Sequence, residues 1–475
     1  MKREQNRTIM GKRVAFLTLG CKVNSYETEG MRELFLKAGA VEVDFEEEAD
    51  IYIVNTCAVT NIADRKSRQM MHRARKRGNG ALVVAAGCYA QAAGERLGEQ
   101  DGVDLVIGNN RKAEIVELTE HALEQRETET YRALLDIAKE RRFEELPIET
   151  VTEHTRAYIK IEDGCNQFCS YCIIPYVRGR VRSRALPEVL AEIKRLASEG
   201  YREVVLTGIH LSSYGLDRKK DAGEETASEF DATLAEKETA DETVLPLLVL
   251  LKEAQKVEGI ERIRLGSLEP RIMTEAFVKE LALLSKICPH FHLSLQSGCD
   301  ATLKRMNRKY TTAEYKEAVE RLRRYFTKPA ITTDVIVGFP GETEEEFAET
   351  MRFVKEEAFS QIHIFKYSRR AGTAADKLET QIPEPVKAER AETLAELEKE
   401  LEYNYRKQFD GVTEPVLFEE KVTVDGAEYM VGHTTRYIKA AVPASGNFVP
   451  QPNETAFVRL SDAVIKDAVA AEVFV

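Results

Sequence analysis

The sequence lacks the features that mark a membrane-bound or secreted protein. Its 475 residues contain no apolar run long enough to cross a bilayer, and MKREQNRTIMGKR passes into a strand-like run without the apolar core of a leader. These absences predict a cytoplasmic protein with no membrane partner. The Gly-rich loop that ends in Gly-Lys-Ser/Thr is also missing, so nucleotide hydrolysis is not expected.

Cysteine is sparse as well. Eight cysteines, unevenly placed in a chain of this length, do not form the dense disulfide framework of a small secreted domain. In a reducing compartment, clustered thiols more often bind metal. Cys288 and Cys299 have no partners at suitable spacing and are predicted to be structural.

Acidic residues outnumber basic ones, but many of the basic residues are clustered in two short segments. The net charge is -12, and residues 217–243, with ten acids against four bases, read as a flexible acidic surface insertion. The helical run 65–77 instead holds seven Arg or Lys and no acid. In 178–184, arginine occupies every second position. Two basic faces are therefore expected on an acidic protein.

Three regions follow one another along the chain. In residues 11–125 short β-rich runs alternate with helical ones, which predicts an open α/β domain with a mainly parallel sheet. Residues 150–385 repeat the strand-helix unit six times; a closed barrel of this kind needs eight, so a partial (β/α)6 barrel, open along one side, is expected. Residues 409–475 alternate strand-like runs with turns and predict a small β-barrel.

The loop GCNQFCSYC places Cys165, Cys169 and Cys172 after the first strand of the second region. Barrel enzymes place their sites at this end of a strand. Short cysteine runs in ferredoxins wrap an iron-sulfur cluster but supply a fourth thiolate, which this loop does not. One iron of a four-iron cluster would therefore remain open to a small molecule.

The alternative is a zinc site or three unrelated thiols. A structural zinc needs four protein ligands, and no Cys or His pair follows at suitable spacing. The C-x3-C-x-aromatic-C pattern, with Tyr171 before the last cysteine, resembles the motif of the radical S-adenosyl-L-methionine (SAM) superfamily. The resemblance implies that SAM chelates the open iron and that reduction by the cluster yields an adenosyl radical.

The first region holds a second group of thiols. Cys21, Cys57 and Cys88 each follow a different predicted strand. The carboxyl ends of neighbouring parallel strands meet at one sheet edge, so the three thiols are expected to converge on a second cluster with an open iron. The alternative is that these small apolar residues are merely buried near strand ends.

Two cysteine trios in this order, followed by a β-barrel similar to the TRAM module, resemble the methylthiotransferases over essentially the whole chain. The resemblance implies two [4Fe-4S] clusters and SAM as cofactors. It also implies that the adenosyl radical removes a hydrogen, the second cluster presents sulfur, and another SAM donates the methyl group. An electron donor such as flavodoxin or ferredoxin and a sulfur source would be needed as partners.

Several motifs most resemble the branch that modifies N6-threonylcarbamoyladenosine at tRNA position 37. They are LGCKVNSYETE, DGCNQFCSYCIIPYVRGRVRSR, LTGIHLSSYG, RIRLGSLEP and HLSLQSGCDATLKRMNRKYT. The isopentenyladenosine branch and the branch that modifies a ribosomal-protein aspartate are the alternatives within the family. A non-catalytic, redox-responsive iron-sulfur protein that binds RNA is the alternative from another class.

Contacts to SAM can be proposed from barrel position. A glycine after the second strand would let the backbone approach the methionyl group, and acidic or amide side chains after later strands would bind methionyl or ribose groups. Each of these residues could instead cap a strand or form a turn. The candidates are Tyr171, Thr207, Gly208, Glu269, Gln296 and Gly338.

The arginines after the cluster loop are the candidate RNA contacts. On an extended segment, alternate side chains share one face, where guanidinium groups could contact successive phosphates. The alternatives are a solvated or internally paired strand and a role in binding SAM or the threonylcarbamoyl carboxylate. The residues are Arg178, Arg180, Arg182 and Arg184. The expected partner is a tRNA anticodon stem-loop, whose unpaired bases can be read individually.

Overall fold

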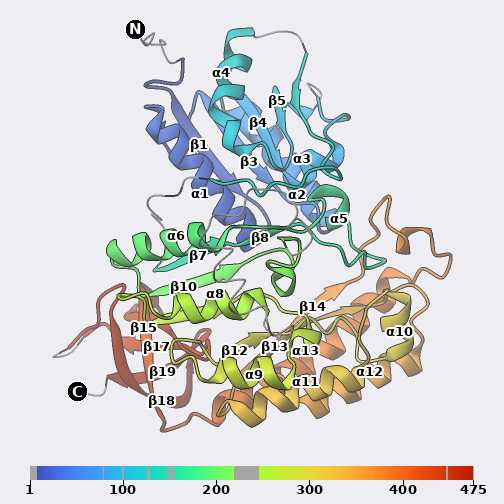
Figure 1. Cartoon of the computed structure of the whole chain (residues 1–475), viewed down its shortest axis with the longest axis vertical. Helices are drawn as coiled ribbons and strands as arrows, with labels where there is room; N and C mark the ends of the chain where they lie inside the picture. Colours follow the sequence, from blue (N-terminus) through green and yellow to red (C-terminus); the bar gives the residue numbers. More distant parts are fainter. Residues whose placement is uncertain are drawn as a thin grey trace.

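The computed structural model describes residues 8–78, 80–98, 101–125, 129–146, 148, 155–218, 245–445 and 448–473. It shows an N-terminal α/β layer, a half-closed barrel beneath it and a small barrel of strands at the C-terminal end (Figure 1). The predicted acidic insertion at 217–243 lies almost entirely outside the described residues. No described helix combines the length and the apolar character needed to cross a bilayer.

The N-terminal sheet has six strands in the order β2-β1-β3-β4-β5-β6, and every pairing is parallel. Its apolar strands separate two buried clusters, one on each face, against which the helices pack. The strands are β1 (Arg13–Thr18), β2 (Val41–Glu42), β3 (Ile51–Thr56), β4 (Leu82–Gly87), β5 (Leu105–Ile107) and β6 (Tyr131–Ala133). The helices are α1 (Lys22–Lys37), α2 (Asn61–Arg77), α3 (Cys88–Ala93) and α4 (Ile115–Gln125). Strand β6 extends this sheet past the boundary predicted at residue 125.

The central region is an open half-barrel of six parallel strands. Two three-stranded sheets, β7-β10-β11 and β12-β13-β14, meet through the bridge between Ile263 and Ile287, which leaves β7 and β14 as free edges. This arrangement confirms the partial barrel. The strands are β7 (Arg156–Lys160), β10 (Glu203–Thr207), β11 (Arg262–Leu265), β12 (His290–His292), β13 (Ala330–Val337) and β14 (Gln361–Lys366).

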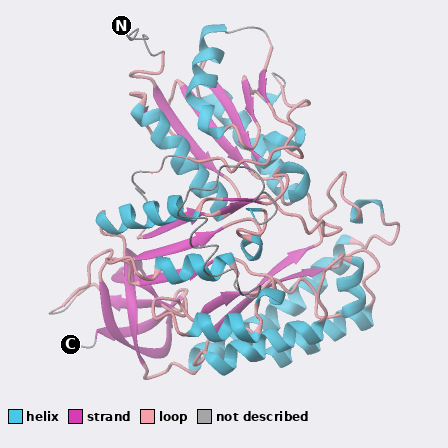
Figure 2. Ribbon diagram, viewed as in Figure 1, coloured by secondary structure: helices cyan, strands magenta, loops and turns pink. Residues whose placement is uncertain are grey.

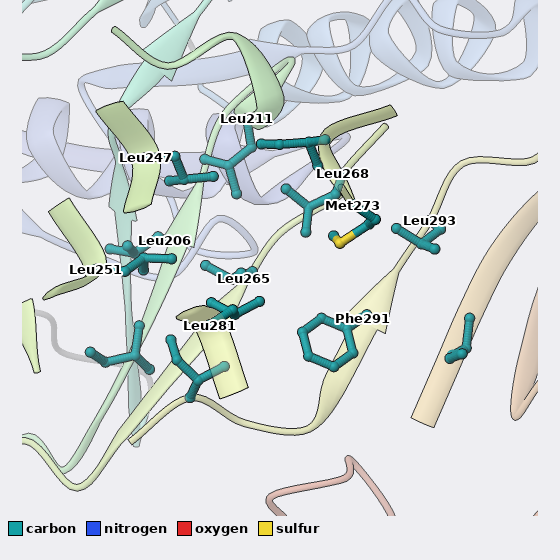
Figure 3. Close-up of a cluster of buried hydrophobic side chains, with 14 of the residues drawn as sticks. Leu206, Leu211, Leu247, Leu251, Leu265, Leu268, Met273, Leu281, Phe291 and Leu293 are labelled. Atoms are coloured by element: carbon teal, nitrogen blue, oxygen red, sulfur yellow. The ribbon is translucent and has the colours of Figure 1, made fainter. Parts of the chain in front are cut away.

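Helices cover the outer surface of the half-barrel (Figure 2). Leucines on β10 and β11 and Phe291 on β12 pack against leucines of α8 and α9 in one continuous core (Figure 3). Two helices begin with reciprocal capping boxes, Thr311 with Glu314 and Thr343 with Glu346, which satisfy free backbone N–H groups. The main helices are α6 (Leu186–Ser198), α8 (Pro246–Ala254), α9 (Glu275–Ala282), α10 (Asp300–Arg305), α11 (Thr312–Tyr325), α12 (Glu344–Glu357) and α13 (Glu384–Lys407).

The C-terminal strands close into a small barrel in the order β15-β16-β17-β19-β18. Alternate residues such as Val416, Phe418 and Val458 fill its interior. The strands are β15 (Thr413–Val424), β16 (Ala427–Thr434), β17 (Lys439–Pro443), β18 (Thr455–Ile465) and β19 (Ala468–Val473). The predicted strand-rich barrel is therefore present.

The turn between β16 and β17 joins this small barrel to the amino-terminal end of the half-barrel. The ring of Tyr437 stacks on His290 at 4.9 Å and on His433 at 4.6 Å between centroids. The guanidinium groups of Arg156 and Arg264 lie over the same ring at 5.1 and 4.8 Å. Tyr437 therefore contributes to holding the small barrel against the base of the half-barrel, together with hydrogen bonds from Arg262 to the His433 and Pro415 carbonyls.

We expect Tyr437→Ala to destabilise this junction by about 2 kcal/mol, because aromatic and cation-π pairs contribute roughly 0.5–1 kcal/mol each. The measurement is the urea midpoint of unfolding together with the rate of proteolytic release of the C-terminal barrel. Tyr403→Ala is the control, since Tyr403 is 44% exposed on α13. Equal behaviour of the two variants would contradict the junction role of Tyr437.

Candidate active site

The three cysteines of the first region lie at the carboxyl edge of the N-terminal sheet. Cys21 follows β1, Cys57 follows β3 and Cys88 follows β4, and these three strands are neighbours. Burial raises the pKa of Cys57 to about 11, and both other thiols add to the increase. Gly20, at φ +108°, allows the close approach, because a Cβ there would lie 3.0 Å from the Cys57 sulfur. Cys21 is exposed, whereas the other two thiols are buried.

The second trio lies on a loop after β7 and the short strand β8 (Glu162–Asp163). The Cys172 N–H donates to the Cys169 carbonyl at 2.9 Å, and the Cys165 N–H donates to Gly179 at 3.0 Å. Phe168, in the left-handed region at φ +50°, is held by a 2.9 Å hydrogen bond from Asn307 to its carbonyl. The loop is therefore fixed in a tight curve that gathers its thiols.

In each trio, one cysteine sulfur accepts a hydrogen bond from an arginine. Arg178 Nε donates to the Cys88 sulfur at 3.2 Å, and Arg308 Nη1 donates to the Cys169 sulfur at 3.1 Å. Both contacts place a cationic donor directly beside a cysteine sulfur. Thiolate donors, partial burial and a cationic neighbour together fit an iron-sulfur cluster at each trio.

A single zinc ion fits neither trio. Four thiolates around zinc at about 2.3 Å lie roughly 4 Å from one another. Within the described chain, the ligand atoms of His292, Asp334 and His363 gather within 4.8 Å, but no cysteine group is as tight. Cys288 and Cys299 are both 2% exposed and add no ligand to either trio, as expected for structural residues.

The two trios lie next to each other across the domain interface. Helix α5 (Ile174–Val177), directly after the cluster loop, contacts α3, which begins at Cys88. Asn109 Nδ2 donates to the Val177 carbonyl at 2.7 Å and lies 3.8 Å from the Cys88 sulfur. Burial raises the pKa of Cys172 to about 12, and Cys88 contributes to the increase. Groups held by the two trios would therefore face a common space.

The predicted RNA role of the arginine run needs correction. Arg178 and Arg182 are fully buried, and Arg184 is 6% exposed. Arg178 pairs with Glu27 at 2.9 Å and with Asp163 at 3.0 Å. These three side chains cannot reach a phosphate, because their guanidinium groups neutralise carboxylates inside the domain interface.

Two other arginines of the run 178–184 are also paired with carboxylates. Arg182 lies 3.4 Å from Asp163, and Arg184 pairs with Glu145 at 2.7 Å and with Glu192. Arg180 is different, since it is only partly buried and lies over the ring of Phe168 at 4.4 Å. An RNA contact at Arg180 remains a prediction, alongside the exposed basic side chains of α2.

The candidate SAM residues surround the cluster loop. Gln167 Nε2 donates to Glu269 at 3.2 Å, which links this carboxylate to the loop. The ring of Tyr171 meets Phe339 edge-on at 6.5 Å between centroids. Thr207 is buried at the end of β10, whereas Gln296 is buried four residues beyond β12, in the left-handed region at φ +71°. Their roles in binding SAM remain predictions.

The reasoning for Gly208 needs correction, and Gly338, whose part in binding SAM remains a prediction, is packed in the same way. A Cβ at Gly208 would lie 2.8 Å from the Glu162 carboxylate, and one at Gly338 would collide with Lys387 of α13. The space left by each missing side chain is already filled by protein. These glycines therefore permit packing of the barrel, and they do not open room for a ligand on that side.

Sequence reasoning missed a polar group inside the half-barrel. His292 Nε2 lies 3.1 Å from Asp334 Oδ2, and the His292 and His363 rings stack at 5.6 Å. Lys22 and Tyr158 lie at the same opening, with the ammonium 5.9 Å from the ring centroid. The signal was present, because polar residues occupy alternate positions of β12, β13 and β14 and thus share one face.

A six-stranded half-barrel with three thiols beyond its first strand defines a radical SAM enzyme. Residues 159–354 match the model of the Radical SAM superfamily, and residues 13–108 match Uncharacterized protein family UPF0004. Among solved structures, the radical SAM methyltransferase TsrM from Kitasatospora setae is similar in fold, with a TM-score of 0.52 and 15% identity. That alignment covers 77% of this chain and 74% of TsrM.

Curated relatives are similar over nearly the whole length. The threonylcarbamoyladenosine tRNA methylthiotransferase MtaB of Bacillus subtilis is 39% identical, with 92% of this chain and 91% of that protein aligned. MtaB of Aquifex aeolicus is 41% identical over 82% and 88%. The tRNA-2-methylthio-N(6)-dimethylallyladenosine synthase of Clostridium novyi is 36% identical over 89% of each. This chain belongs to the radical SAM methylthiotransferase family, whose cofactors are SAM and [4Fe-4S] clusters.

Proposed function

We propose that this protein converts N6-threonylcarbamoyladenosine at tRNA position 37 to its 2-methylthio derivative. The observation that carries the proposal is the pair of adjacent cysteine trios, one at the sheet edge and one at the barrel mouth, joined by the contact of α3 with α5. The activity named for the MtaB relatives agrees with this chemistry. The isopentenyl substrate is the second candidate, since the Clostridium novyi relative carries that activity in its name.

Each trio has a separate task in this proposal. Cys165, Cys169 and Cys172 would hold the cluster that binds SAM, and Cys21, Cys57 and Cys88 would hold the cluster that delivers sulfur. Bound in this way, the cofactors supply hydrogen abstraction, sulfur and a methyl group. Arg308 and Arg178 donate hydrogen bonds to the Cys169 and Cys88 sulfurs and would help to orient the ligands of each cluster.

The domains divide the work accordingly. We assign the sulfur-delivering cluster to residues 11–125, the SAM-binding barrel to 150–385 and RNA binding to the TRAM-like barrel at 409–475. Arg180 and the exposed face of α2 are the candidate contacts for the anticodon stem-loop, because Arg65, Arg73 and Lys76 are exposed there. A flavodoxin- or ferredoxin-like reductant, a sulfur source and a cytoplasmic location complete the proposal.

The direct test is product analysis with synthetic anticodon stem-loops. Reconstituted protein, SAM, a sulfur source and a strong reductant are incubated with stem-loops that carry either threonylcarbamoyladenosine or isopentenyladenosine. We expect mass spectrometry of the nucleosides to show the 2-methylthio product from the first only. Product from the isopentenyl substrate alone would replace the proposal with the second candidate. Binding of RNA with no SAM cleavage would favour a redox-responsive RNA-binding protein.

A further inference from the structure

Lys22 occupies an unusual place between the two domains. It directly follows Cys21 and begins helix α1, which packs against edge strand β7 of the half-barrel. Its side chain is exposed, and its ammonium lies 5.9 Å from the centroid of Tyr158, on the interior face of β7. A cation at the first position of a helix opposes the helix dipole, so helix stability does not explain this lysine.

The open side of the half-barrel lies between edge strands β7 and β14. Tyr158 belongs to the first edge and His363 to the second. The His363 ring stacks on His292 at 5.6 Å, and the Lys22 ammonium lies over Tyr158 at the opposite edge of the opening. Lys22 therefore reaches from the N-terminal domain into the gap through which a substrate could enter.

Three other cations of the half-barrel are already paired with carboxylates. Arg264 pairs with Glu203 at 2.8 Å, Arg156 with Glu419 at 3.3 Å, and Lys160 with Glu27 at 3.0 Å. Within the described part of the chain, no carboxylate forms an ion pair with Lys22. A lysine that is exposed inside a concave site and lacks an acidic partner is available to bind an anion.

The substrate in the proposed function supplies such an anion. A threonine attached through its amino group to the carbamoyl carbon keeps a free carboxylate. In the adenine ring, C2 and the carbon that bears N6 flank the same nitrogen, N1, so the modified substituent lies close to the reacting position. When C2 faces the exposed Cys21 side of the sulfur-delivering site, the carboxylate must be received by residues next to Cys21.

We propose that Lys22 binds the carboxylate of the threonylcarbamoyl group and thereby selects acidic N6 substituents over neutral ones. This inference rests on the proposed function and deepens it by naming a specificity residue. Lys22 forms a charge-assisted hydrogen bond with the carboxylate, while Tyr158 and His363 border the same substituent on the two edge strands. Asp334 is turned toward His292, to which it is 3.1 Å away, and the nearby Glu203 is paired with Arg264 at 2.8 Å.

The test compares the acid substrate with its methyl ester, which has the same shape without the charge. Dissociation constants for stem-loops with each modification are measured with reconstituted wild-type protein, Lys22→Gln and Lys22→Arg. Lys279→Gln is the matched control, because Lys279 is exposed on outer helix α9. Iron content and uncoupled SAM cleavage are measured for every variant to verify that both clusters are intact.

We expect wild-type protein to bind the acid about 10- to 100-fold more tightly than the ester, the range for a hydrogen bond to a charged group. Lys22→Gln should bind both ligands equally, at the affinity of the ester, with iron content unchanged. Lys22→Arg should keep most of the preference, and Lys279→Gln all of it. Equal affinity of the wild-type protein for acid and ester, or a preference retained in Lys22→Gln, would overturn the inference.

The experiments distinguish failure of the proposed function from failure of the role assigned to Lys22. If the wild-type protein makes no methylthio product from the threonylcarbamoyl stem-loop, the proposed function is wrong. If it makes that product from acid and ester with the same kcat/KM, the function stands and only the role of Lys22 falls. Should Lys22→Gln lose iron, Lys22→Met is measured in its place, and a preference for the acid retained in that variant would overturn the inference.

Discussion

Cys169→Ala is expected to abolish reductive cleavage of SAM while the protein remains folded. Cys169 is one of only three thiols at the barrel mouth, and its sulfur receives a 3.1 Å hydrogen bond from Arg308. With two ligands left, the cluster should be lost, so iron should fall from about eight atoms per chain to about four. Iron analysis and the release of 5′-deoxyadenosine under anaerobic reduction measure the two effects.

Two further variants make this result specific. Cys299→Ala removes a buried thiol outside both trios and should retain full iron content and SAM cleavage. Cys57→Ala removes a ligand of the other trio and should retain SAM cleavage but form no methylthio product. Full cleavage activity in Cys169→Ala would reject the assignment of the barrel trio.

Arg178→Met is expected to destabilise the protein by about 3–5 kcal/mol, although its side chain is distant from any surface. The guanidinium group is fully buried between Glu27 and Asp163, with N···O distances of 2.9 and 3.0 Å. Removing one partner leaves buried carboxylates under-compensated, which is the costly way to break an internal ion pair. The measurement is the urea midpoint of the transition that exposes the domain interface.

The control for this prediction is Arg73→Met on the exposed face of α2, where the guanidinium pairs with Glu46 at the surface. Such a pair contributes at most about 1 kcal/mol, so the midpoint should hardly move. If Arg178→Met instead kept the wild-type midpoint and weakened tRNA binding in a salt-dependent way, the original RNA interpretation of this arginine would be correct.

The same network gives the pH dependence of stability. Burial acts to raise the pKa of Glu27, but Arg178, Lys112 and Lys160 together hold that pKa well below its usual value of 4.5. A lowered carboxyl pKa stabilises the fold above the usual value and loses this contribution as the pH falls. Arg178→Met should therefore unfold at a higher pH than the wild-type protein in an acid titration.

The sequence could predict the fold because each region has a clear periodicity. The buried strands β3 and β4 are near-continuous apolar runs between helices, a pattern that only a covered parallel sheet satisfies. The cysteines could be predicted as well, since a residue directly after a parallel strand must lie at the carboxyl edge of the sheet. Three neighbouring strands then bring three thiols together, whatever the details of packing.

Which charged side chains are buried and paired, by contrast, was decided by tertiary packing. From the sequence, Arg178 and Arg182 look like a surface stripe, since alternation shows which side chains share a face and does not show what covers that face. Helix α1 covers it here, and Glu27 on that helix, more than 150 residues away in the sequence, neutralises the guanidinium. Lys22 lies on the same helix, directly after Cys21 in the sequence. The ring that its ammonium contacts, Tyr158, belongs to the other domain. The chain by itself therefore determined which elements form and where the thiols lie. The docking of the two domains decided which cations are paired inside and left Lys22 without a carboxylate partner among the described residues, because burial and pairing depend on surfaces that meet only in the folded protein.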